Sequence, residues 1–130
     1  MSDHNELVKT NEEIGKRESQ GDKDYFNELL APSFAFMRAS GDFDGREDFL
    51  KRLKKSDART TLVASVSFTG VRRAIVTCIV EMSGKHYHNI RTFVQPKGKW
   101  LLLSWANEEV EIPIADLRPP KPSPQDPVPI

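Results

Sequence analysis

The stretch that decides the fold runs from Arg59 to Glu109 and reads RTTLVASVSFTGVRRAIVTCIVEMSGKHYHNIRTFVQPKGKWLLLSWANEE. Residues 62–68 alternate between two faces, which predicts a strand. Residues 74–80 are apolar on both faces, which is typical of a central strand covered on both sides. Turns at 83–85 and 96–99 lead into two further strands, at 86–95 and 100–109. Four successive strands joined by short turns predict an antiparallel meander.

The residues before this stretch favour helices. Leu7, Val8 and Ile14 form a thin apolar stripe that ends near Gly21. Asp22 can cap a second, short helix, which a proline at position 32 then ends.

A third helix is predicted after a short strand at 34–37. The segment Asp44-Gly45-Arg46-Glu47 is typical of a capping box, with acceptor side chains at the N-cap and three residues later. The helix that it opens carries Phe49 and Leu53 on one face. Helices first and strands afterwards predict an α+β fold with an antiparallel sheet.

The composition excludes several classes of protein. Lysine plus arginine is 19 and aspartate plus glutamate is 19, so the chain has no net charge that would favour nucleic acid or an anionic membrane. The basic residues between Lys51 and Lys55 are interpreted as a solvated helix face. No apolar run approaches a membrane span, and the N-terminal residues do not look like a signal peptide. The single Cys78 fits a reducing compartment and reads as an inert buried thiol, so we expect a cytoplasmic protein.

The last residues differ in kind from the rest. Seven of the nine prolines lie between Pro113 and Pro129, without apolar periodicity. We therefore predict one domain over residues 1–111 and an extended, proline-rich tail over 112–130. The spacing of Pro119 and Pro122 matches a ligand motif for aromatic grooves, but a solvated tail or one docked on a dimer is the preferred interpretation.

Three segments in this order resemble the nuclear transport factor 2-like superfamily, and its SnoaL-like branch of small bacterial proteins in particular. They are Gly21-Asp22 with Leu29 to Phe34, Gly41 to Arg46, and Arg91-Thr92-Phe93-Val94 through Lys97-Gly98-Lys99-Trp100. The resemblance covers roughly residues 5 to 110 and implies a cone-like, strongly curved sheet that closes on a pocket with three helices. The superfamily holds enzymes and non-catalytic scaffolds, so the fold alone does not give a function.

The resemblance also excludes two reactions. The ketosteroid isomerase pattern needs an acidic base and two acidic donors, and its positions fall near Arg38, Ile14 and Ile90, none of which is an acid. The limonene epoxide hydrolase pattern needs an aspartate two residues from an arginine, and Arg91 has none. Dehydratases of the family use pocket histidines, which keeps His86 and His88 as candidates.

His86 and His88 are the predicted catalytic residues. They share strand parity with Ile90, which the resemblance places toward the cavity, and a histidine pair there could act as general acid and base. Alternatively, they lie in water or bind pocket neighbours. Two histidines are too few for a zinc site, so no metal and no cofactor is predicted.

Four further residues are predicted to bind a ligand: Arg38, Trp105, Asn107 and Tyr25. Arg38 could bind a carboxylate, or it could form an ion pair with Asp42, Asp44 or Glu81. Trp105 and Asn107 share one strand face, which the resemblance places toward the cavity, so they would form a wall and a polar anchor; alternatively, Trp105 is part of the core. Tyr25 could reach the same cavity or simply close the core.

Two functions of different classes remain open. The first is a pocket that binds or converts, by lyase or isomerase chemistry, a small, partly apolar metabolite, either neutral or anionic. The second is a non-catalytic homodimeric module with a filled cavity. The dimer would form through the convex sheet face, where strand parity places a patch of large apolar side chains, Tyr87, Phe93, Trp100 and Leu102.

Overall fold

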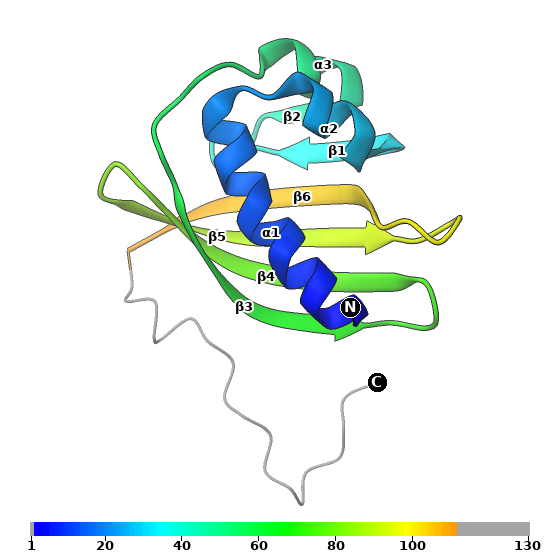
Figure 1. Ribbon diagram of the computed structural model, residues 1–130. Coiled ribbons are helices and arrows are strands. Elements are labelled where there is room, and N and C mark those ends of the chain that lie inside the picture. Colours follow the sequence, from blue (N-terminus) through cyan, green and yellow to red (C-terminus); the bar gives the residue numbers. More distant parts are fainter. Residues whose placement is uncertain (1, 112–130) are drawn as a thin grey trace, which may run out of the picture.

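The computed structural model describes residues 2–111, and the predicted proline-rich tail lies outside the described residues. The chain folds as α+β, with helices packed on one face of a curved sheet that stays open (Figure 1). The elements, in chain order, are α1 (Asp3–Gln20), α2 (Lys23–Leu29), β1 (Leu30–Met37), β2 (Phe43–Gly45), α3 (Arg46–Arg52), β3 (Thr60–Phe68), β4 (Arg73–Met82), β5 (Lys85–Val94) and β6 (Leu101–Val110).

The sheet is built on the predicted meander. Strands β3 to β6 pair antiparallel in sequence order, as expected from their short connecting turns. Strand β1 then adds in parallel beside β6, and β2 pairs antiparallel with β1, so the order is β2-β1-β6-β5-β4-β3. The small β2 was not predicted, because Asp44 was interpreted as a helix cap.

The predicted capping box at Asp44 is wrong. Gly45 is the N-cap of α3, and no side chain bonds to the first turn. Asp44 instead pairs with Phe36 in the β1–β2 ladder, and its carboxylate is buried at 2% exposure. The Asp44 carboxylate binds Arg38 instead of the helix, which is one of the ion pairs that the sequence left open.

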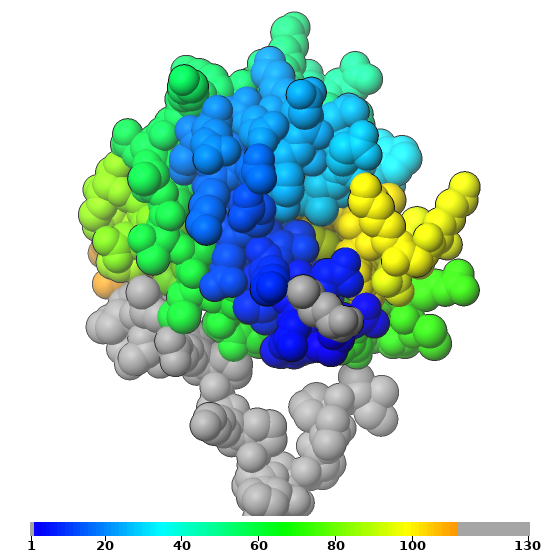
Figure 2. All heavy atoms as spheres, in the orientation of Figure 1, coloured from blue at the N-terminus to red at the C-terminus, as the bar shows by residue number. Residues whose placement is uncertain are grey.

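Helix α1 lies across the sheet and defines its inner face (Figure 1). The Ser2 side chain accepts a hydrogen bond from the Asn5 amide at its start, and Gly21 ends it in the left-handed conformation, at a φ of 65°. A Cβ at Gly21 would lie 2.7 Å from the backbone carbon of Lys54, so only glycine allows this close approach. With all atoms drawn, the helices cover the middle of this face (Figure 2).

An aromatic cluster joins the short helices to the sheet. The Phe49 ring lies 5.2 Å from Phe36, 5.3 Å from Phe34 and 5.4 Å from Phe26, each in an edge-on arrangement. Trp105 continues the cluster, with its ring centroid 4.9 Å from that of Phe36. Each such pair contributes about 0.5–1.5 kcal/mol beyond simple burial, so the cluster holds α2 and α3 over one end of the sheet.

The inner face of β5 carries the side chains that were predicted to face outward. Phe93 is fully buried opposite Leu102 in the ladder, and Arg91 is fully buried opposite Trp105. Because side chains alternate along a strand, His86, His88 and Ile90 lie on the outer face. The predicted position of Ile90 toward the cavity is therefore wrong, and its side chain is 44% exposed.

A bulge in β6 corrects the predicted outer patch. Phe93 pairs with Leu102 while Thr92 pairs with Ser104, so Leu103 is an extra residue. The bulge puts Leu102 and Trp105 on the same, inner face, although with two residues between them regular alternation would put them on opposite faces. Trp100 and Leu102 are therefore buried within the chain and are not part of an outer apolar patch.

Candidate functional site

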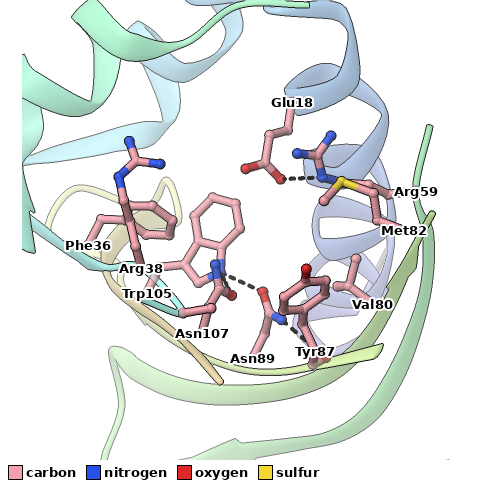
Figure 3. Close-up of a pocket in the computed structure, with 11 residues that line it drawn as sticks. Glu18, Phe36, Arg38, Arg59, Val80, Met82, Tyr87, Asn89, Trp105 and Asn107 are labelled. Carbon is pink, nitrogen blue, oxygen red and sulfur yellow. Dashed lines mark hydrogen bonds and ion pairs between the residues drawn. The ribbon is translucent and has the colours of Figure 1, made fainter. Parts of the chain in front are cut away.

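A cavity of about 180 Å³ opens between the end of α1 and the inner faces of β4, β5 and β6 (Figure 3). Trp105, Asn107, Asn89 and Tyr87 form its polar floor. The remaining wall combines apolar and charged side chains, namely Phe36, Ala39, Val80, Met82, Glu18, Arg38 and Arg59.

Hydrogen bonds fix the floor. The Trp105 indole N–H donates to Asn89 Oδ1 at 2.6 Å and to Asn107 Oδ1 at 3.0 Å. Since the oxygen of Asn107 accepts this bond, its amide nitrogen remains as a donor. Within the described residues neither that nitrogen nor the Tyr87 hydroxyl has a hydrogen-bond partner. Both groups are therefore available to a ligand.

A buried cation lies directly behind this floor. The Arg91 guanidinium is fully buried, packs 4.4 Å from the Trp105 ring centroid, and donates to Asn89 Oδ1 at 3.2 Å. It also donates to Asn11 Oδ1 at 3.1 Å, on helix α1. No carboxylate forms an ion pair with Arg91 within the described residues, so the contacts that stabilise its positive charge are neutral side-chain and backbone acceptors and the Trp105 ring.

Cys78 borders the same buried network. Its Sγ lies 3.8 Å from an Arg91 nitrogen and 3.7 Å from Asn11 Oδ1. Burial raises the pKa of the Cys78 thiol, and Arg91 lowers it by a smaller amount. A buried thiol with a raised pKa fits the predicted inert role.

Glu18 and Arg59 form an ion pair on the opposite side of the cavity. Arg59 Nε lies 3.1 Å from Glu18 Oε1, and the Glu18 side chain is 16% exposed. Burial raises the pKa of Glu18, and attraction to Arg59, Arg91 and Arg38 lowers it by less. Glu18 is thus a carboxylate that the cavity holds in a poorly hydrated environment.

Arg38 lies at the cavity mouth, above the Phe36 ring (Figure 3). Its guanidinium binds the buried Asp44 carboxylate through Nη2 at 2.7 Å and Nε at 3.0 Å. Arg52 approaches the other Asp44 oxygen at 3.5 Å. Arg38 therefore forms one of the ion pairs considered from the sequence and also lines the cavity.

Three of the six predicted site residues come together here: Arg38, Trp105 and Asn107. His86 and His88 do not, because they lie on the outer face of β5, where His86 Nε2 is 3.5 Å from Glu81 Oε2. Their predicted placement in the cavity is therefore wrong, while a catalytic role for them stays a prediction.

Tyr25 is also outside the cavity. Its ring packs edge-on against Phe26 at 5.2 Å and lies under the Arg17 guanidinium at 5.3 Å. Burial raises the pKa of its hydroxyl to about 12. Tyr25 therefore closes the core, which was the alternative interpretation.

Four polar or charged cavity residues were not predicted: Glu18, Arg59, Tyr87 and Asn89. A signal was present in β5, where Tyr87 and Asn89 share parity with Phe93, a large apolar residue that must be buried. For Glu18 and Arg59 the sequence holds no local signal, because they lie far apart in the chain. Arg59 is 40 positions from Ser19, the neighbour of Glu18 that it also binds.

Residues 2–111 contain no group of three or more histidine, cysteine, aspartate or glutamate side chains that could hold a metal ion. In the same range, no helix is long and apolar enough to cross a membrane.

Comparison with known proteins identifies the fold. No protein-family model and no curated protein matches the chain. A nuclear transport factor 2-like protein from Cytophaga hutchinsonii superposes with a TM-score of 0.72 at 12% identity, over 85% of this chain and 100% of that one. A protein of the same description and unknown function from Silicibacter pomeroyi gives 0.70 at 15% identity, with the same coverage.

The association domain of C. elegans CaMKII is also similar, with a TM-score of 0.67 at 16% identity over 81% of this chain and 94% of that domain. The SnoaL-like branch stays a prediction. The curved sheet, the three helices and these similarities show that the chain has the nuclear transport factor 2-like fold.

Proposed function

We propose that the inner cavity binds a small, partly apolar metabolite. The observation that carries this proposal is the polar floor, where Asn107 and Tyr87 offer donors that no described residue uses. A cavity with convergent unused donors between aromatic walls is typical of a ligand site.

The size of the cavity limits the ligand. An enclosed apolar cavity of about 150 Å³ is enough to hold benzene. The cavity here is of similar size, at about 180 Å³, and it is partly open to solvent. A ligand with one ring or a short chain, bearing a carbonyl or hydroxyl group toward Asn107 and Tyr87, fits these limits.

Binding is better supported than catalysis. The two histidines that would transfer protons lie on the outer face of the sheet. Glu18 is the one carboxylate among the residues that line the cavity, and it is engaged with Arg59. We therefore assign the site a binding role first.

A cavity-filling substitution tests this proposal. Met82 lines the cavity, and Met82→Trp should fill it, whereas Met37→Trp adds the same bulk on the exposed outer face. Small aromatic acids and amides should raise the melting temperature of the wild type and of Met37→Trp, but not of Met82→Trp. Equal shifts in all three proteins would place the binding elsewhere and overturn the proposal.

A second candidate function is an association module. It is favoured by the similarity to the CaMKII association domain and by exposed apolar side chains on the outer face. Met37 is 46% exposed and Ile90 44%, and both line an outer-face groove of about 310 Å³ with Ala106. Such a patch favours burial against a second copy of the chain.

Sedimentation tests this second function. The wild type should show about twice the chain mass of 14.8 kDa, and Ile90→Lys should reduce it to one chain. Val71→Lys is the control, since Val71 is 89% exposed in a turn away from the sheet face. A wild type that remains monomeric at high concentration would exclude this function.

A further inference from the structure

A second cavity, of about 160 Å³, adjoins the first. The two share four lining residues, Glu18, Phe36, Arg38 and Arg59. Its remaining wall comes from α3 and the loop that follows, including Arg52 and Lys54. The two cavities are therefore neighbouring parts of one site, with a neutral polar floor at one end and a basic wall at the other.

The charge around the second cavity is unbalanced. Four basic side chains line it, Arg38, Arg52, Lys54 and Arg59, and Glu18 is the one acidic side chain in the same lining. If the buried Asp44 beneath Arg38 is included, four positive charges face two negative ones. The chain as a whole carries 19 basic and 19 acidic residues, so this excess is local. A concentrated positive charge in a partly enclosed space attracts an anion.

The arginines also have donors to spare. Arg38 uses Nε and Nη2 on Asp44, which leaves Nη1 without a partner among the described residues. Arg59 uses Nε on Glu18 and Nη1 on Ser19, Ser56 and Asp57, which leaves Nη2. Guanidinium groups held by existing bonds are already oriented, so an oxyanion loses little freedom by binding to them.

We propose that the second cavity is an oxyanion subsite of the ligand site. A carboxylate or phosphate group binds among Arg38, Arg52, Lys54 and Arg59, while the apolar part of the same molecule occupies the first cavity against Phe36 and Trp105. This proposal rests on the binding function proposed above. It assigns the ligand class as small organic acids or phosphate esters, and it orients the molecule across the two cavities.

Glu18 acts as a competing anion in this arrangement. Its carboxylate already binds Arg59, and Glu18 lines both cavities. Glu18→Gln removes that charge with little change in shape. The substitution should therefore tighten the binding of an anionic ligand by about threefold, the size expected for one partly screened charge.

Calorimetry with three probes tests the subsite: phenylacetate, the neutral isostere phenylacetamide, and phenyl phosphate. Arg52→Gln with Lys54→Gln removes two exposed charges that line the second cavity. Lys23→Gln with Lys55→Gln removes two exposed charges that do not line either cavity. The net charge change is the same, so long-range attraction is matched between the two double variants.

The first double variant should weaken phenylacetate binding about tenfold, as expected for two screened contacts to one carboxylate, and the control should change it less than about twofold. Phenylacetamide should bind more weakly than phenylacetate to the wild type and respond to neither double variant. Whichever of phenylacetate and phenyl phosphate binds the wild type more tightly shows whether the subsite prefers a carboxylate or a phosphate.

Two failures are distinguishable. If phenylacetamide binds as well as phenylacetate and the first double variant has no effect, the oxyanion subsite is wrong, but the binding function stands. If no probe binds the wild type, the binding function itself is wrong. An equal loss of phenylacetate affinity in both double variants would mean that long-range attraction alone explains the effect, and it would overturn the subsite.

Discussion

Replacing Asn11 by leucine should destabilise the protein strongly, because Asn11 holds the buried charge behind the cavity. Asn11 is fully buried, and its Oδ1 accepts the 3.1 Å hydrogen bond from Arg91 Nη1. Arg91 has no carboxylate partner among the described residues, and its Nε is already buried without a partner. Leucine at position 11 would leave a second charged donor without its side-chain acceptor.

The magnitude follows from that lost bond. A hydrogen bond to a charged group contributes about 1.5–3 kcal/mol, and leaving the charged partner buried adds to the loss. The backbone oxygen of Asn11 still accepts from Nη1, but at 3.3 Å, so it compensates only in part. We expect the free energy of unfolding to fall by about 3 kcal/mol.

Urea denaturation followed by circular dichroism measures the change. Asn5→Leu is a matched control, since Asn5 is an exposed asparagine on the same helix and should change stability by less than about 0.5 kcal/mol. Asn11→Asp should retain most of the stability at neutral pH, because a carboxylate there pairs with Arg91. A loss below about 1 kcal/mol for Asn11→Leu would refute the view that Asn11 supports the buried charge.

Two further predictions concern Gly21 and Glu18. Gly21→Ala should destabilise the folded protein clearly more than Gly98→Ala does. Both glycines have a positive φ, so the backbone strain is similar. A Cβ at Gly21, however, would lie 2.7 Å from the Lys54 backbone, whereas one at Gly98 would meet nothing within 4 Å. Equal losses in urea denaturation would mean that the close approach is unimportant. Because burial raises the pKa of Glu18 above its usual 4.5, ionised Glu18 disfavours the folded state. Relative to Glu18→Gln, the wild type should therefore gain stability as the pH is lowered from about 7 toward about 5, as measured by urea denaturation at both values, and a loss over this range would contradict the raised pKa.

The sequence was sufficient for the fold because the strands carry their signals locally. Alternating side chains and turn residues mark β3 to β6, and the glycine and aspartate at 21 and 22 mark the break between α1 and α2. The parallel pairing of β1 with β6 joins residues far apart in the chain, and no local pattern indicates it.

The site was predicted only in part, for two physical reasons. The resemblance places Ile90 toward the cavity, and this misled the orientation of β5 and of His86 and His88, whereas Arg91 on the opposite parity is fully buried. The β6 bulge changes the side-chain parity of that strand, and no sequence signal marks Leu103 as the extra residue. Trp105 and Asn107 were placed correctly because both follow the bulge, where the alternation is regular again.

The most direct test of the ligand site uses the two tryptophans of the chain as reporters. The Trp105 indole N–H lies in the cavity floor, bonded to Asn89 and Asn107, whereas the Trp100 indole N–H donates to Asp3 at 3.2 Å, away from the cavity. In a two-dimensional ¹H–¹⁵N spectrum each gives its own signal. Titration with phenylacetate should move the Trp105 indole signal and leave the Trp100 signal in place. A Trp105 signal that stays unchanged at saturating phenylacetate, or a shift confined to Trp100, would contradict the assignment of this cavity as the ligand site.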